Sequence, residues 1–168
     1  MKRMLALMLV AAGVQAAELA VYVLGDAAVE PEVNCAARGQ AARMLEDIGV
    51  RIRWGRRPDA IEVRLITGHV GNPGRVAFAT PYASRPVVTV LYDRVIAMTY
   101  QRPDLHAPLL AHVLVHELAH VLMRTVDHAD SGVMKAEWSL TDMLQMKSHP
   151  LRFVRADAEM IRRALPGD

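Results

Sequence analysis

Apolar and polar residues alternate in two short segments of the first half of the chain. In residues 50–54 and 61–66 every second residue is apolar. This is the period of a half-buried β-strand, in which alternate side chains face the core. Residues 19–24 and 87–91 are apolar runs bounded by glycine or proline, and they predict two further strands. Residues 76–79, bracketed by prolines and glycines, predict an edge strand.

Other segments have helical spacing. Residues 33–48 place apolar side chains on one face, although Gly39 lies within the segment. Residues 109–123 are apolar almost all round, which places this helix in the middle of a domain, and Pro108 fits its first turn. Shorter helices are predicted at residues 92–100, 139–146 and 155–165. The order of strand, helix, strands, buried helix and small helices predicts a single α+β domain.

The N-terminus has the layout of a secretory signal peptide. Lys2 and Arg3 precede an apolar run, and residues 14–16 fit a small-x-small cleavage site. The run is too short to span a bilayer comfortably. We therefore predict a signal peptide at residues 1–16, a mature domain at residues 17–168, export to the periplasm or extracellular space, and no stable membrane anchor after cleavage.

Charge and cysteine content narrow the possible partners. The chain has 20 Lys and Arg against 18 Asp and Glu, and loss of Lys2 and Arg3 with the signal peptide makes the two counts equal. The arginines form no dense patch, which argues against a nucleic acid partner. Cys35 is the only cysteine, so no intramolecular disulfide can form. We expect it to be a small buried apolar residue rather than a thiolate that blocks a metal site.

The pentapeptide His116-Glu117-Leu118-Ala119-His120 has the clearest chemical meaning. Histidines four apart on a helix differ by about 40° in direction, so both can bind one Zn²⁺ from the same face. Glu117 lies beside them and can act as general base toward water at the metal, then as acid toward the leaving amine. The alternative is a pair of core histidines with a structural glutamate.

A third ligand is expected after the helix. His128 is the first choice, because the chain leaves the helix through residues 124–127 and can turn back toward the metal. His112 lies one turn before His116, and we expect it to support the site or to pack. The alternative ligands offer carboxylate oxygens: Asp127, Asp130 and Glu137. The remaining histidines are expected at surface or loop positions: His69, His106 and His149.

This region resembles the metzincin metallopeptidases. The pentapeptide is similar to their zinc-binding helix, His128 to their third histidine, and residues 131–134 to their methionine turn, with Met134 beneath the metal. Met123 stands where the family has a turn glycine and Val126 where it has its third histidine, so His128 comes two residues late.

The stretch from His116 to Trp138 is similar to a group of small exported bacterial proteins with a zinc signature of this kind. No tyrosine follows Met134, so the transition-state tyrosine of some metzincins has no counterpart. The resemblance implies a mixed twisted sheet with a buried zinc-binding helix and small C-terminal helices. It also implies that residues 76–79 lie above the metal cleft and pair with an extended peptide.

The motif and the resemblance together predict a zinc-dependent endopeptidase acting on a peptide or protein. Its metal ligands are His116, His120 and His128, and its catalytic base is Glu117. Two alternatives remain. One is a zinc hydrolase of another amide or of a cell-wall peptide, because the motif determines water activation and not the substrate. The other is a non-catalytic module in which zinc only stabilises the fold.

Overall fold

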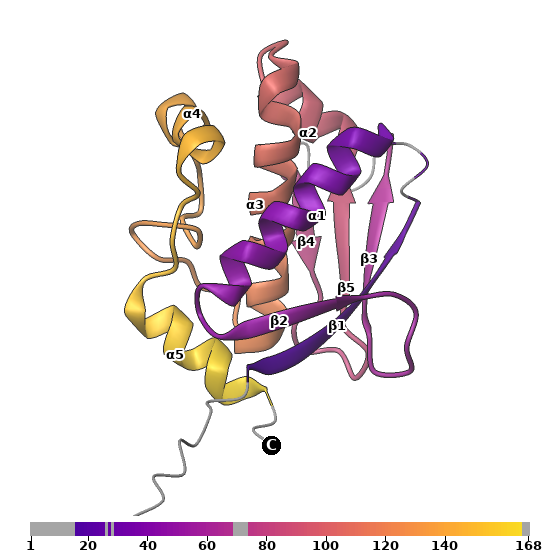
Figure 1. Cartoon of the computed structure of the whole chain (residues 1–168), viewed down its shortest axis with the longest axis vertical. Helices are drawn as coiled ribbons and strands as arrows, with labels where there is room; N and C mark the ends of the chain where they lie inside the picture. The colour runs from indigo at the N-terminus through magenta and orange to yellow at the C-terminus, as the bar shows by residue number, and fades with distance from the viewer. Residues whose placement is uncertain (1–15, 26, 28, 69–73, 166–168) are drawn as a thin grey trace, which may run out of the picture.

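The computed structural model describes residues 16–25, 27, 29–68 and 74–165. They form a five-stranded sheet of order β2-β1-β3-β5-β4 (Figure 1). Four strands are parallel: β1 (Ala17–Leu24), β2 (Val50–Trp54), β3 (Ile61–Ile66) and β5 (Val87–Leu91). At one edge, β4 (Ala77–Ala79) pairs antiparallel with β5. The predicted α+β fold with a mixed sheet is confirmed. The predicted signal peptide, except Ala16, lies outside the described residues.

Two long helices lie side by side across one face of the sheet, as Figure 1 shows. Helix α1 (Pro31–Glu46) connects the parallel strands β1 and β2, and helix α3 (His106–Met123) follows the short helices α2 (Tyr92–Met98) and η2 (Pro103–Leu105). Helix α1 begins earlier than predicted, because Pro31 occupies its first turn. Helix α2 ends earlier than predicted, before Tyr100 and Gln101, whose φ angles are positive.

The prediction for Cys35 is wrong, because this residue is exposed. Helix α1 buries a stripe that repeats every three to four residues: Ala37, Ala41, Met44 and Leu45. Cys35 precedes Ala37 by two positions, which is about 200° of helical rotation and directs its side chain to the opposite face. Its sulfur therefore does not lie near the other helices of the core.

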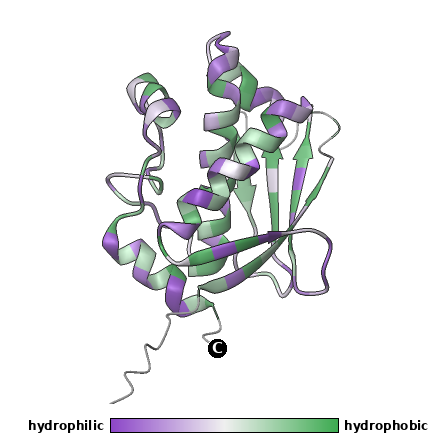
Figure 2. Ribbon diagram, viewed as in Figure 1, coloured by the Kyte–Doolittle hydropathy of each residue, from purple (hydrophilic) through white to green (hydrophobic). Residues whose placement is uncertain are grey.

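Helix α3 is the centre of the core. Every residue from Leu109 to Leu122 is buried, and the helix contacts α1, β4, β5 and the C-terminal helices α4 (Leu140–Ser148) and α5 (Arg155–Ala164). Among the described residues, one helical stretch, Pro103–Met123, is long and apolar enough to cross a membrane, and 83% of its most apolar window is buried within the domain. Figure 2 shows hydrophobic stretches in the central strands and hydrophilic stretches on α5. Burial in the core therefore accounts for the apolar character of α3.

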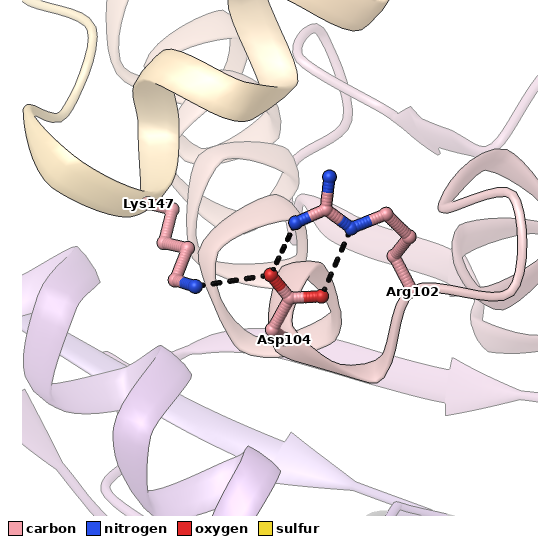
Figure 3. A network of polar contacts seen from close by, with 3 residues as sticks. All are labelled: Arg102, Asp104 and Lys147. Atoms are coloured by element: carbon pink, nitrogen blue, oxygen red, sulfur yellow. Dashed lines mark hydrogen bonds and ion pairs between the residues drawn. The ribbon is translucent and has the colours of Figure 1, made fainter.

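Polar contacts attach α4 to the start of α3. The Asp104 carboxylate accepts hydrogen bonds from Arg102 at 2.7 Å and from Lys147 of α4 at 3.0 Å (Figure 3). Both cations hold the pKa of Asp104 far below its usual range. At the N-terminus of α4, the side chains of Ser139 and Asp142 form a capping box.

The segment between α3 and α4 folds back on itself. The Ala129 N–H donates to the Met134 carbonyl at 2.8 Å, and the Val133 N–H donates to the Arg152 carbonyl at 3.1 Å. Gly132 lies in this turn with a φ of +75°. A Cβ atom on Gly132 would lie 2.2 Å from the Arg152 carbonyl oxygen, so the turn has room only for glycine.

We expect Gly132→Ala to lower the free energy of unfolding by about 1–3 kcal/mol, because alanine adds both backbone strain and a collision with Arg152. Gly39→Ala is the matched control. Gly39 lies within helix α1, and the nearest atom to an added Cβ there is 3.5 Å away, so this change should stabilise by up to about 1 kcal/mol. Urea denaturation measures both. An unchanged stability of Gly132→Ala would contradict this account of the turn.

Candidate metal centre

Three histidines converge at the C-terminal half of α3. Ligand atoms of His116, His120 and His128 all lie within 4.8 Å of one another. The first two are buried on α3, whereas His128 is exposed on the segment that follows it. The rings of His128 and His116 are stacked with centroids 5.2 Å apart, and the His128 and His120 centroids are 4.9 Å apart. The structure thus brings together the three residues that the sequence analysis named as ligands.

Backbone carbonyls orient the two helical histidines. The Nδ1 of His116 lies 2.9 Å from the Val133 carbonyl oxygen, and the Nδ1 of His120 lies 3.0 Å from the Thr125 carbonyl oxygen. A carbonyl only accepts hydrogen bonds, so each Nδ1 carries the hydrogen and each neutral ring has a lone pair on Nε2. Such an outer hydrogen bond is the usual support of a metal-binding histidine.

The two Nε2 atoms face each other at 3.0 Å. Burial lowers the pKa of His116 to about 4 and also lowers the pKa of His120, so both rings are neutral at pH 7. Two lone pairs at this distance repel unless a cation lies between them. A tetrahedral zinc ion with bonds of about 2.0–2.1 Å separates two ligand nitrogens by about 3.3 Å. The donor set therefore fits a metal ion.

The alternative third ligands are less well placed than His128. The Asp127 carboxylate accepts a hydrogen bond from the Thr125 hydroxyl at 2.9 Å, and Asp130 lines a separate cavity beside α4. Glu137 borders the same cleft as the histidines but does not belong to their cluster. His128 reaches the cluster despite its late position because Arg124 adopts a left-handed conformation, with φ 51°, that ends α3 and turns the chain.

Glu117 is buried beside the cluster, with 7% of its surface exposed. Burial raises the pKa of its carboxyl group to about 7, and the positive charge of Arg75 partly opposes this rise. Glu117 nevertheless borders the cleft. A carboxyl group with a pKa near neutrality can both accept and return a proton at physiological pH, so its environment suits general acid–base chemistry.

The cleft has a volume of about 560 Å³ and is bordered by four parts of the chain: residues 74–81, Met98 at the end of α2, helix α3, and residues 126–138. Edge strand β4 forms one wall. Trp138 forms part of another, with its ring edge-on to His116 at a centroid distance of 5.4 Å. The sequence analysis did not identify Arg75, at the start of the first wall, as a site residue. No local pattern distinguishes this arginine from the others.

The other histidines lie apart from the cluster. His112 is buried, and its Nδ1–H donates to the Pro108 carbonyl at 2.7 Å while its Nε2 accepts from the Leu151 N–H at 3.0 Å. Both nitrogens are therefore used within the fold, and His112 has a packing role. His106 and His149 do not border the cleft, and His69 lies outside the described residues.

The comparisons with known proteins give a likeness of fold. No protein-family model matches the chain, and no curated protein sequence matches it. Among solved structures, the chain is similar to the archaemetzincin from Methanopyrus kandleri, with a TM-score of 0.60 and 15% sequence identity, over 93% of this chain and 98% of that one. The chain therefore has the α+β fold of archaemetzincin, and two of its three clustered histidines, His116 and His120, lie on the central helix α3.

Proposed function

We propose that this protein is a zinc-dependent peptidase. The observation that carries the proposal is the cluster of His116, His120 and His128 beside the buried carboxyl group of Glu117, in a cleft open to solvent. The likeness in fold to archaemetzincin also supports a zinc-dependent peptidase. Zinc bound by the three histidines supplies a Lewis acid that polarises a carbonyl group and makes water more acidic.

The protein's own residues then orient the substrate and move the proton. The Val133 and Thr125 carbonyls keep the two helical histidines in the tautomer that directs Nε2 toward the metal. Glu117 accepts a proton from the attacking water and delivers it to the nitrogen of the departing amine. Its burial supports this role: without metal, burial raises the pKa of the carboxyl group to about 7, which makes its carboxylate a stronger base than an exposed one.

A structural zinc site is a weaker explanation. Such sites normally close the metal with four protein ligands, whereas the cluster found among the described residues has three members. One of these, His128, is exposed, and the cleft leaves space for water or substrate at the remaining position. These features favour a catalytic role over a purely stabilising one.

The free edge of β4 supports a peptide as the substrate. The Val76 carbonyl accepts from the Leu91 N–H at 2.8 Å, and the Thr80 N–H donates to β5 at 3.0 Å. Because hydrogen bonding alternates along an antiparallel strand, the backbone groups of Ala77 and Ala79 point away from β5. Both residues border the cleft, so an extended peptide can pair with them there as an added strand.

We expect the purified protein to bind one zinc ion per chain and His128→Ala to weaken binding by about 100-fold or more, since even supporting residues around a metal contribute up to this factor. Competition with a fluorescent chelator measures the affinity. His149→Ala, which removes an exposed histidine outside the cluster, serves as the control. Unchanged affinity of His128→Ala would assign the third ligand to Asp127, Asp130 or Glu137.

Glu117→Gln should retain zinc and lose about 10²- to 10⁴-fold in kcat/KM, because the amide fills the same space but cannot accept the proton. A peptide mixture read by mass spectrometry supplies the substrates, and elemental analysis gives the zinc content. Glu46→Gln, an exposed carboxylate at the end of α1, should behave like wild type. Residual activity of Glu117→Gln within a few-fold of wild type would refute the assigned base.

Ala79→Pro should impair cleavage of long peptides more than cleavage of short blocked substrates. Proline removes an N–H from the free edge of β4 while the bonds to β5 remain, and an edge strand tolerates this change. Zinc content should be unchanged. Equal loss of activity on long and short substrates would contradict pairing of the substrate with β4, and Ala77→Pro provides an independent repeat of the test.

A further inference from the structure

Arg75 is an exposed cation at the entrance to edge strand β4. It borders the cleft, and its backbone carbonyl accepts a hydrogen bond from Arg94 at 2.6 Å. Its guanidinium forms no ion pair or hydrogen bond with another of the described side chains. The nearby charge that it influences is Glu117. Arg75 therefore borders the cleft that also contains Glu117, and its guanidinium has donors available for a ligand.

The other charged residues bordering the cleft differ from Arg75. Lys135 forms an ion pair with Asp142 at 2.6 Å, and both side chains are partly buried. Glu117 is buried and is assigned to proton transfer. Glu137 is exposed, but it carries a negative charge and belongs to the segment after Met134. Of the described residues that border the cleft, Arg75 thus offers the accessible, unpaired positive charge.

Strand direction tells which part of a bound peptide meets Arg75. Strand β4 runs from Ala77 to Ala79, and a peptide added antiparallel to it, the more stable arrangement, runs the opposite way. The amino-terminal part of that peptide lies beside Ala79, and its carboxyl-terminal part passes Ala77 and continues toward Arg75. The carboxyl-terminal part of the peptide therefore approaches Arg75.

We propose that Arg75 binds a carboxylate of the substrate on the carboxyl side of the scissile bond, either the chain end of a short peptide or the side chain of an aspartate or glutamate. A guanidinium matches the geometry of a carboxylate with two parallel hydrogen bonds. The proposal rests on the peptidase function proposed above and specifies the substrate class: peptides with a negative charge shortly after the cleaved bond.

The test compares three peptides with one common sequence around the cleaved bond. The first ends in a free carboxylate, the second in an amide, and the third in an amide preceded by glutamate. Wild type should favour the first or third over the second by about fivefold in kcat/KM, the size expected for an exposed ion pair, and added salt should reduce this preference. A preference for the first peptide indicates that Arg75 binds the carboxylate of the chain end. A preference for the third indicates that it binds the side-chain carboxylate of glutamate.

Arg75→Gln should bring the ratios of kcat/KM among the three peptides close to one. Arg85→Gln is the matched control: Arg85 is an exposed arginine of the loop after β4 that does not border the cleft, so its loss changes the net charge equally and should leave the preference intact. An undiminished preference in Arg75→Gln would overturn the proposal. An equal loss on all three peptides would also overturn it, because Arg75 would then act only through Glu117.

Binding measurements keep this test independent of turnover. Dissociation constants of the same peptides for zinc-loaded protein, measured by calorimetry, should show the carboxylate preference in wild type and not in Arg75→Gln. Failure of wild type to cleave any peptide, with zinc bound, would refute the peptidase function. A carboxylate preference in binding that disappears in Arg75→Gln would still support the contact, and an equal affinity of wild type for all three peptides would refute it.

Discussion

The burial of helix α3 from Leu109 to Leu122 is the constraint that organises the rest of the domain. A buried helix cannot leave a polar side chain without a partner, because burial of an unpaired polar group costs several kcal/mol. Each of its three buried histidines hydrogen-bonds to backbone groups: His112 to Pro108 and Leu151, His116 to Val133, and His120 to Thr125. The same bonds that satisfy the helix also hold the loops that surround the cleft.

Burial shifts the pKa values of the histidines and of the glutamate in the site in opposite directions. It disfavours the charged form of each, so it lowers the pKa values of His116 and His120 and raises that of Glu117. The histidines are thereby kept as neutral donors at physiological pH, ready for a cation without first losing a proton. The carboxyl group is brought to a pKa at which proton transfer in either direction costs little. One environment thus suits both the proposed metal ligands and the proposed base.

The walls of the cleft supply groups that helix α3 does not provide: a third histidine, backbone groups of an edge strand, and a positive charge. His128 comes from an exposed segment, so the cluster is closed on the side of α3 and open toward solvent. Strand β4 contributes unpaired backbone groups, and Arg75 contributes a positive charge where that strand begins. The likeness to archaemetzincin at 15% identity indicates that the arrangement of sheet and central helix tolerates almost complete exchange of side chains. Under the proposed function, substrate preference is expected to reside in wall residues such as Arg75.

Elements whose burial pattern is local could be predicted from periodicity alone. Strands at residues 50–54, 61–66 and 87–91 have the predicted bounds, and the apolar run of α3 with its His-Glu-x-x-His motif identified the helix and two of the clustered histidines. The sequence analysis also favoured His128 as the third ligand, but its choice over Asp127, Asp130 and Glu137 required the folded structure. The place of His128 depends on how the chain turns after α3, the exposure of Cys35 on which face of α1 meets the core, and the position of Arg75 on which strand lies at the edge of the sheet. Such contacts join residues far apart in the chain, and periodicity contains no information about them.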